Sequence, residues 1–295
     1  MAKILVAGRS GQVAQSLAEA AADRPGMELV CLGRPDLDIA DLDSVKKAFA
    51  AHAPDLVINA AAYTAVDQAE TDRDEAYAGN EGGPKNLAEA ASAAGVPLFH
   101  ISTDYVFDGE GTEPYEETDP VSPLGVYGSS KLAGEEAVLK AHEQAAIFRT
   151  AWVYGVYGKN FLKTMLRLAA DRDELGVVAD QRGAPTSSHD IAKGLLDVAE
   201  AWLGGKVERG IYHMTAGGEA VWADFAEAIF EESAAQGGPS ATIRRIPSSE
   251  FPTPAKRPSY SVLSSDKLAA TYDVRLPHWR DRVAPIVARV LNEGS

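Results

Sequence analysis

The sequence predicts an α/β fold in which a doubly wound parallel sheet carries a smaller, partly interleaved C-terminal lobe. Through the first half of the chain, short apolar runs alternate with stretches rich in Ala, Leu, Glu and Lys. The apolar runs are continuous rather than alternating, which is typical of strands covered on both faces. A glycine-containing turn directly follows the first run. Together these features predict a Rossmann-like domain.

The first half supplies the alternating units. The expected strands are the apolar runs Lys3–Ala7, Glu28–Leu32, Asp55–Asn59, Val96–Ser102 and Ala145–Arg149. The expected helices are Gln12–Ala22, Ser44–His52, Glu75–Ala94 and Val126–Ala141. Strands that alternate with helices indicate parallel βαβ units.

The second half is less regular. Helices are expected over Phe161–Ala170, His189–Leu203 (starting near Ser188), Trp222–Ala235 and Leu276–Asn292, and strands over Gly176–Ala179 and Gly210–Met214. The prolines of Phe251–Pro258 exclude a regular element there. Because no polar linker marks a boundary, we expect a main domain over residues 1–155, to which later segments return, and a smaller lobe mainly over residues 156–295.

Composition excludes several classes of function. The formal net charge of −15 argues against a nucleic-acid partner, which needs excess Lys and Arg. Cys31 is the only cysteine, so no intrachain disulfide can form, as suits a reducing compartment. No apolar run is long enough for a signal peptide or a membrane span. We therefore expect a cytoplasmic protein without a membrane partner.

The turn after the first strand has the spacing GxxGxxA, from Gly8 through Gly11 to Ala14. Residues without a Cβ let the chain bend and approach a pyrophosphate, while the following helix N-terminus offers amide donors. The alternative is an ordinary turn. The position at the first βα junction favours a dinucleotide site, with cofactor contacts from the turn residues Gly8, Arg9, Gly11, Gln12 and Val13.

The end of the second strand indicates which dinucleotide is bound. NAD enzymes usually place a carboxylate there for the ribose 2′-hydroxyl. Here Arg34 follows Cys31-Leu32-Gly33, and Arg9 lies in the glycine turn. Two guanidinium groups and no carboxylate favour a 2′-phosphate. NADPH is the predicted cofactor, with NADH left open and with solvated surface as the alternative interpretation of both arginines.

Tyr127 and Lys131 lie one helical turn apart, on the same face. An ammonium near a phenol favours the phenolate and lowers the pKa of the phenol from about 10 toward neutrality. The pair is then suited to acid–base catalysis. The alternative is a tyrosine stacked on a lysine stem at a helix surface.

A hydroxyl is available nearby at the end of the strand predicted from Val96. Thr103 follows directly, and ligands in open α/β sheets bind beyond the carboxyl ends of the strands. Thr103 can therefore polarise a substrate carbonyl beside Tyr127, or else it simply caps the next turn. Thr103, Tyr127 and Lys131 are the predicted catalytic residues. Together with the glycine turn they indicate an oxidoreductase site more strongly than any one of these features does alone.

Longer segments add a resemblance to a known family. They are residues 55–67 (DLVINAAAYTAVD), 102–107 (STDYVF), 127–135 (YGSSKLAGE), 148–154 (FRTAWVY), 160–161 (NF), 183–186 (GAPT) and 252–258 (PTPAKRP). With these motifs the chain closely resembles dTDP-4-dehydrorhamnose reductases, members of the extended short-chain dehydrogenase/reductase family. The similarity runs from Lys3 to about Trp279.

The resemblance implies NADPH-dependent reduction of the 4-keto group of dTDP-4-dehydro-L-rhamnose to give dTDP-L-rhamnose. In that scheme Tyr127 donates the proton, Lys131 also orients the nicotinamide ribose, and Thr103 assists at the carbonyl. Further cofactor contacts implied by the resemblance are Asp38, Ile39, Ala62, Tyr63 and Thr64. Implied substrate contacts are Thr103, Asp104 and Trp152. The charge of Arg257 and its family-like setting indicate a partner for the diphosphate, with ordinary surface as the alternative. Residues 1–155 then bind NADP(H), and residues 156–295 mainly bind the sugar nucleotide.

The chain also departs from the family pattern. Some members form metal-bridged dimers through carboxylates, but the matching positions here are about Ser16 and His189, so no metal is inferred. Tyr260 stands where Asn is frequent. The protein is expected to be a monomer or a homodimer. Two alternatives remain: a reductase of a related 4-keto-6-deoxy sugar nucleotide, and a non-catalytic NADP-binding regulatory subunit, which retention of Thr103, Tyr127 and Lys131 disfavours.

Overall fold

The computed structural model describes residues 1–293, and the last two residues of the predicted smaller lobe lie outside this range. Its centre is a six-stranded sheet in the order β10-β5-β4-β3-β1-β2. The strands are β1 (Ala2–Ala7), β2 (Met27–Leu32), β3 (Leu56–Asn59), β4 (Leu98–Thr103), β5 (Ala145–Thr150) and β10 (Gly210–His213). Every pairing is parallel. The predicted doubly wound sheet is confirmed, and its strand order reverses between β1 and β3.

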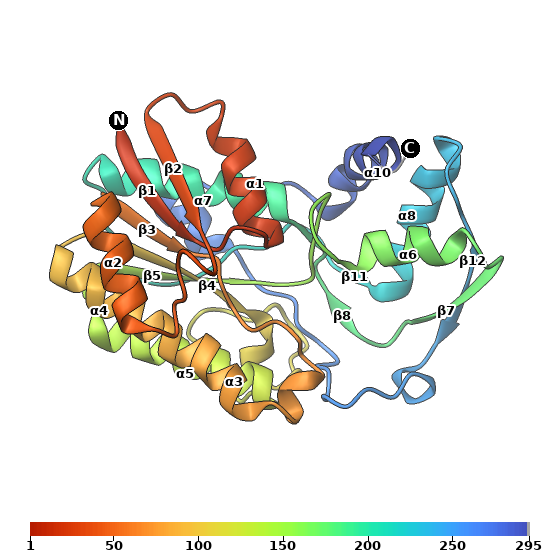
Figure 1. Cartoon of the computed structure of the whole chain (residues 1–295). Coiled ribbons are helices and arrows are strands. Elements are labelled where there is room, and N and C mark those ends of the chain that lie inside the picture. Colours follow the sequence, from red (N-terminus) through yellow and green to blue (C-terminus); the bar gives the residue numbers. More distant parts are fainter. Residues whose placement is uncertain (294–295) are drawn as a thin grey trace.

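Helices cover both faces of this sheet (Figure 1). The helix α1 (Gln12–Ala21) packs against α7 (Ser188–Leu203), while α4 (Gly83–Ala94) contacts both α2 (Leu42–His52) and α5 (Val126–Ala141). Successive side chains of a strand point to opposite faces, so a single strand serves two cores.

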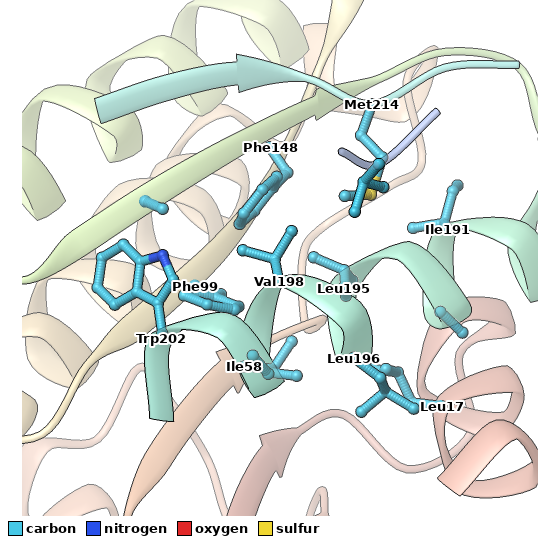
Figure 2. Packing of buried hydrophobic residues seen from close by; sticks show 14 of the residues in the cluster. Leu17, Ile58, Phe99, Phe148, Ile191, Leu195, Leu196, Val198, Trp202 and Met214 are labelled. Carbon is cyan, nitrogen blue, oxygen red and sulfur yellow. The ribbon is translucent and has the colours of Figure 1, made fainter. Parts of the chain in front are cut away.

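The two cores are filled by continuous apolar side chains. Ile58 of β3 lies in the core beneath α1 and α7, whereas its neighbour Val57 lies in the core beneath α2, α4 and α5. In the first core Phe99 meets Phe148 and Trp202 edge to face, with ring centroids 5.2 and 5.1 Å apart. Figure 2 shows these rings in one core with Val198 and Leu195 of α7, while Leu196 points toward Leu17 of α1. Complete burial of each such side chain contributes about 1.5–3 kcal/mol.

A further cluster of apolar side chains, separate from the two cores of the main sheet, forms the smaller lobe. It joins α6 (Phe161–Ala169), β7 (Glu174–Val178), α8 (Trp222–Ala235), β12 (Thr242–Ile246) and α10 (Val283–Glu293). The strand β12 pairs in parallel with β7. In sequence, α7 and β10 fall between the segments of this lobe, yet both pack with the main sheet. Short strands complete the lobe: β6 (Val153–Tyr154), β8 (Arg182–Gly183), β9 (Thr186–Ser187) and β11 (Ala220–Val221).

The helix expected over Glu75–Ala94 is interrupted. The structure has α3 (Arg73–Tyr77), a π-helical turn at Ala78–Gly82 and then α4. The turn directs Asn80 across to the backbone of Tyr63 and to the hydroxyl of Ser130. The interruption therefore follows from tertiary hydrogen bonds that a periodicity argument does not contain.

Other elements also differ from expectation. The strand β12, the short strands of the lobe and the helix α9 (Asp266–Tyr272) were not predicted. The last helix begins at Val283, after a 3₁₀ turn at Trp279–Arg282, rather than at Leu276. The carbonyl of Pro277 and the amide of Trp279 instead bond to Gly217, which holds this segment extended. Within the described range no helix combines the length and apolar character needed to cross a bilayer.

Candidate active site

A cleft of about 580 Å³ opens at the carboxyl ends of β1, β3, β4 and β5. It lies at the reversal of strand order, where ligands of open α/β sheets bind. Ten of the predicted site residues line it: Gly11, Gln12, Val13, Ala62, Thr64, Thr103, Asp104, Tyr127, Lys131 and Trp152. Segments that are far apart in sequence are thus brought together around one space.

The glycine turn forms the floor of this cleft. Gly8 has φ = +125°, and a Cβ there would lie 3.3 Å from the backbone of Ala60. The helix α1 begins after Gly11, and no side chain of the described protein caps its first turn. Its free amides and the helix dipole are suited to a pyrophosphate. The turn therefore fits a dinucleotide.

Arg9 and Arg34 lie beyond the rim of the cleft, near the end of β2. One guanidinium nitrogen of Arg9 donates to Asp36 Oδ2 at 2.7 Å, and the other donates to the Arg34 carbonyl at 3.0 Å. The side chains of Arg9 and Asp36 are each about half exposed. The expectation that no carboxylate stands at this strand end is wrong, because the turn after Arg34 returns Asp36 to Arg9.

Asp38, Ile39 and Tyr63, which were expected to contact the cofactor, do not line the cleft. Asp38 Oδ1 accepts the amide of Ala40, which shapes the loop before α2. Ile39 is buried against Gly83, where an added Cβ would come within 2.5 Å of its side chain. The backbone of Tyr63 is bridged by Asn80, with N–H···O at 2.8 Å and a returning bond at 3.1 Å.

Thr103, Asp104 and Tyr127 meet at the end of β4. Thr103 Oγ1 donates to Asp104 Oδ1 at 3.0 Å and accepts the amide of Tyr105 at 3.2 Å. Burial raises the pKa of Tyr127 to about 12, a bond with Thr103 opposes that rise, and the Asp104 carboxylate adds to it. The predicted lowering of this pKa is wrong, because burial has the largest effect on it. The phenol is protonated at neutral pH, the form that a proton donor needs.

Lys131 is buried beside Tyr127 on α5. Its Nζ donates to the Ile101 carbonyl at 2.6 Å and lies 3.4 Å from His100 Nε2. Burial lowers the pKa of Lys131 to about 8, and the carboxylate of Glu135 acts in the opposite direction. Both ionisation states of this amine are therefore accessible near neutral pH.

Asp104 has a spare acceptor. Its Oδ2 is buried and has no hydrogen-bond partner among the described residues. Burial raises the pKa of Asp104 to about 6, against bonds from Ser261 and Thr103. An acceptor with no partner at the wall of a cleft is suited to a ligand hydroxyl.

The indole of Trp152 closes the side of the cleft toward the smaller lobe. It stacks on Trp222 with centroids 3.5 Å apart and planes 4° apart. Its backbone has φ = +47°, an uncommon value outside glycine. Gly183 is needed beneath it, since a Cβ there would lie 2.5 Å from the ring.

Arg257 is not brought to the cleft wall. Its Nη2 donates to Asp67 Oδ2 at 2.8 Å, which ties the Pro-rich segment to the loop after β3. Burial, and then the Asp104 carboxylate, raise the pKa of Tyr105, which lines the cleft, and the nearby Arg257 guanidinium opposes that rise. The predicted diphosphate partner is thus close to the site but already paired.

Other cleft residues were not singled out from the sequence. Tyr105, Thr150 and Lys159 line the same space. Thr150 ends β5 as Thr103 ends β4, so the position of ligands beyond the carboxyl ends of strands also predicts Thr150. No comparable local signal marks Lys159, which reaches the cleft from a loop.

Ser16 and His189 lie in a separate cavity of about 210 Å³, at the junction of α1, α7 and α10. The hydroxyls of Ser16 and Ser188 are 2.9 Å apart and hydrogen-bonded. In residues 1–293 no group of three His, Cys, Asp or Glu side chains gathers in a way that could hold a metal ion.

The sheet, the glycine turn and the Tyr127–Lys131 pair together define a short-chain dehydrogenase/reductase, a class of oxidoreductases. The family model described as the RmlD substrate binding domain matches residues 2–292. The chain belongs to this family, that of the dTDP-4-dehydrorhamnose reductases.

Its relatives match along almost their whole length. The dTDP-4-dehydrorhamnose reductase of Sinorhizobium fredii is 46% identical over 295 residues, which is 99% of both chains. A crystal structure of the Clostridium acetobutylicum enzyme is 40% identical, with a TM-score of 0.91 over 98% of this chain and 99% of that one. The Bacillus anthracis enzyme, solved in complex with NADP, is 35% identical, with a TM-score of 0.90 over 97% of this chain and 99% of that one.

Proposed function

We propose that this protein reduces the 4-keto group of dTDP-4-dehydro-L-rhamnose to give dTDP-L-rhamnose. The observation that carries the proposal is the convergence of Thr103, Tyr127 and Lys131 on one cleft above the glycine turn. Relatives that bear this activity in their names match the chain over almost its full length. We assign cofactor binding to residues 1–155 and sugar-nucleotide binding mainly to residues 156–295.

The proposed cofactor is NADPH, which supplies a hydride when bound. The free amides before α1 would hold its pyrophosphate, and Arg9 would face the 2′-phosphate, for which it would have to exchange its bond with Asp36. Lys131 would bind the nicotinamide ribose. That donor set fits a phosphorylated dinucleotide.

The chain's own groups would handle the proton. Tyr127 Oη gives its proton to the carbonyl oxygen at C4, becoming a phenolate that the Lys131 ammonium stabilises. The hydroxyl of Thr103 turns from Asp104 to donate to the same oxygen. Asp104 Oδ2 accepts a sugar hydroxyl, and Trp152 packs against the sugar. Arg257 pairs with the diphosphate in place of Asp67.

A coupled assay tests this function. The protein should oxidise NADPH when given dTDP-4-dehydro-L-rhamnose, and NMR of the product should show the L-rhamno configuration. Turnover measured with a panel of other 4-keto-6-deoxy sugar nucleotides would identify the preferred substrate. Tight NADPH binding without turnover on any member of the panel would contradict an enzymatic role and favour a regulatory subunit.

Replacing Arg9 with Ala tests the cofactor assignment. We expect KM for NADPH to rise about tenfold, while KM for NADH stays within about twofold, because one charge-assisted bond to the 2′-phosphate is lost. Steady-state kinetics with both cofactors would measure this. Arg280→Ala serves as the control, since Arg280 pairs with Glu231 at the surface of the smaller lobe. An equal rise in KM for both cofactors would show that Arg9 does not bind the 2′-phosphate.

A further inference from the structure

A buried row of polar side chains runs behind Lys131, away from the cleft. Asn59 at the end of β3 and His100 of β4 are both completely buried, and Lys131 is 2% exposed. Asn59 Nδ2 lies 2.9 Å from His100 Nδ1, and His100 Nε2 lies 3.4 Å from Lys131 Nζ. Asn59 and His100 do not line the cleft, so the cofactor and substrate contacts leave both unexplained.

The hydrogen bonds determine the tautomer of His100. The amide of Ala61 donates to Asn59 Oδ1 at 3.1 Å, which fixes the orientation of that side chain. The NH₂ group of Asn59 therefore faces His100 Nδ1 and donates to it. A neutral imidazole that accepts at Nδ1 carries its proton on Nε2. Burial, and then the charge of Lys131, hold the pKa of His100 well below its usual range, so the ring stays neutral.

The Nε2–H of His100 then points at Lys131. An ammonium offers three donors and no acceptor, so the charged form of Lys131 brings a donor against a donor. The neutral amine has a lone pair that can accept this N–H. The arrangement favours the amine over the ammonium, while the bond to the Ile101 carbonyl fixes where Nζ lies.

We propose that His100, locked by Asn59 as the Nε2–H tautomer, is a positioning residue that holds Lys131 near the balance between its two ionisation states. The inference rests on the proposed function, since it assigns His100 to the acid–base set of that site. Other titratable groups lie near Lys131. On α5, Tyr127 is one turn away, and the Glu135 carboxylate acts to raise the pKa of Lys131. Glu135 is ion-paired with Arg149 of β5, and the pKa of Tyr127 is raised by burial and then by Asp104.

NMR of the histidine side-chain nitrogens tests the tautomer in the intact protein. We expect His100 to carry its proton on Nε2 and to remain neutral from about pH 6 to pH 10, since its pKa lies below its ordinary value of about 6.5. A proton on Nδ1, or an imidazolium in this range, would overturn the proposal. The measurement needs neither substrate nor turnover, so it stands even if the assay for the proposed function fails.

Asn59→Leu tests the consequence for Lys131. Without the Asn59 donor, His100 is free to move its proton to Nδ1 and accept from the ammonium at Nε2. The pKa of Lys131 should then rise by about one unit, the equivalent of one altered hydrogen bond. Because Lys131 acts as the ammonium, activity is lost as the pH rises through this pKa. In the pH profile of kcat/KM, the basic limb should therefore shift to higher pH by about one unit.

Asn80→Leu is the matched control. Asn80 is an equally buried asparagine that bonds to Tyr63 of the same loop and to Ser130 of α5, without a hydrogen bond to His100. It should raise KM for the cofactor and leave the basic limb and the His100 signals unchanged. If the tautomer of His100 changes in Asn59→Leu but the basic limb of the pH profile does not move, His100 does not set the pKa of Lys131, and the proposal is wrong. Should Asn59→Leu fail to fold, direct NMR titration of Lys131 Nζ in the wild type decides, and a pKa near 10.5 would overturn the proposal.

Discussion

Tyr127→Phe is expected to lower kcat by about 10²- to 10⁴-fold, the usual contribution of a positioned general acid. Phenylalanine keeps the ring and its edge-to-face contact with Tyr105, whose centroid lies 5.5 Å away, but has no proton to give. NADPH binding should therefore be retained. Single-turnover kinetics with dTDP-4-dehydro-L-rhamnose, together with a fluorescence titration of NADPH, would separate the two effects.

The control for this substitution is Tyr77→Phe, which removes a hydroxyl from α3 outside the cleft and should leave kcat unchanged. If Tyr127→Phe kept turnover within about threefold of wild type, another acid would be required, because general acids contribute far more than that. Asp104 would then be the first candidate, since its pKa is raised to about 6 and it stands beside Thr103.

Much of the fold could be predicted because the main domain obeys local rules. The inner strands of the sheet are largely apolar runs, since both of their faces are buried, and helices separate the strands. In the smaller lobe, the sequence pattern predicts the strands less well. In β12, for example, Arg244 and Arg245 are exposed and only Ile246 is buried. An exposed strand at the edge of a two-stranded sheet has no apolar pattern to reveal it.

In the candidate active site, too, features that depend on local sequence could be predicted, whereas features that depend on tertiary contacts could not. The turn at Gly8 and the pair of Tyr127 with Lys131 are local patterns, and both reach the cleft. The bond from Arg9 to Asp36, the pairing of Arg257 with Asp67, and the raised pKa of Tyr127 depend on tertiary contacts. Sequence spacing identifies which residues share a helix face, but it does not give the burial that sets their pKa values.

The face of α5 that carries Tyr127 and Lys131 continues one turn further to Glu135, which forms a buried ion pair with Arg149 of β5. The bonds are 2.6, 2.9 and 3.2 Å long, and the two side chains are 1% and 2% exposed. Glu135→Leu should lower the free energy of unfolding by about 3–5 kcal/mol, because it leaves the Arg149 guanidinium buried without a counter-charge. Urea unfolding would measure this as a lower midpoint at unchanged slope.

The double variant Glu135→Leu/Arg149→Met separates the pair's net contribution from the cost of stranding one charge. Well-packed apolar side chains often replace a buried ion pair at little cost, so most of the lost stability should return. The guanidinium also lies over the ring of Phe107, 5.1 Å from its centroid, a contact that methionine can replace in part through its sulfur. If the single variant cost less than about 1 kcal/mol, a value typical of exposed pairs, water would have to reach Arg149 once Glu135 is gone.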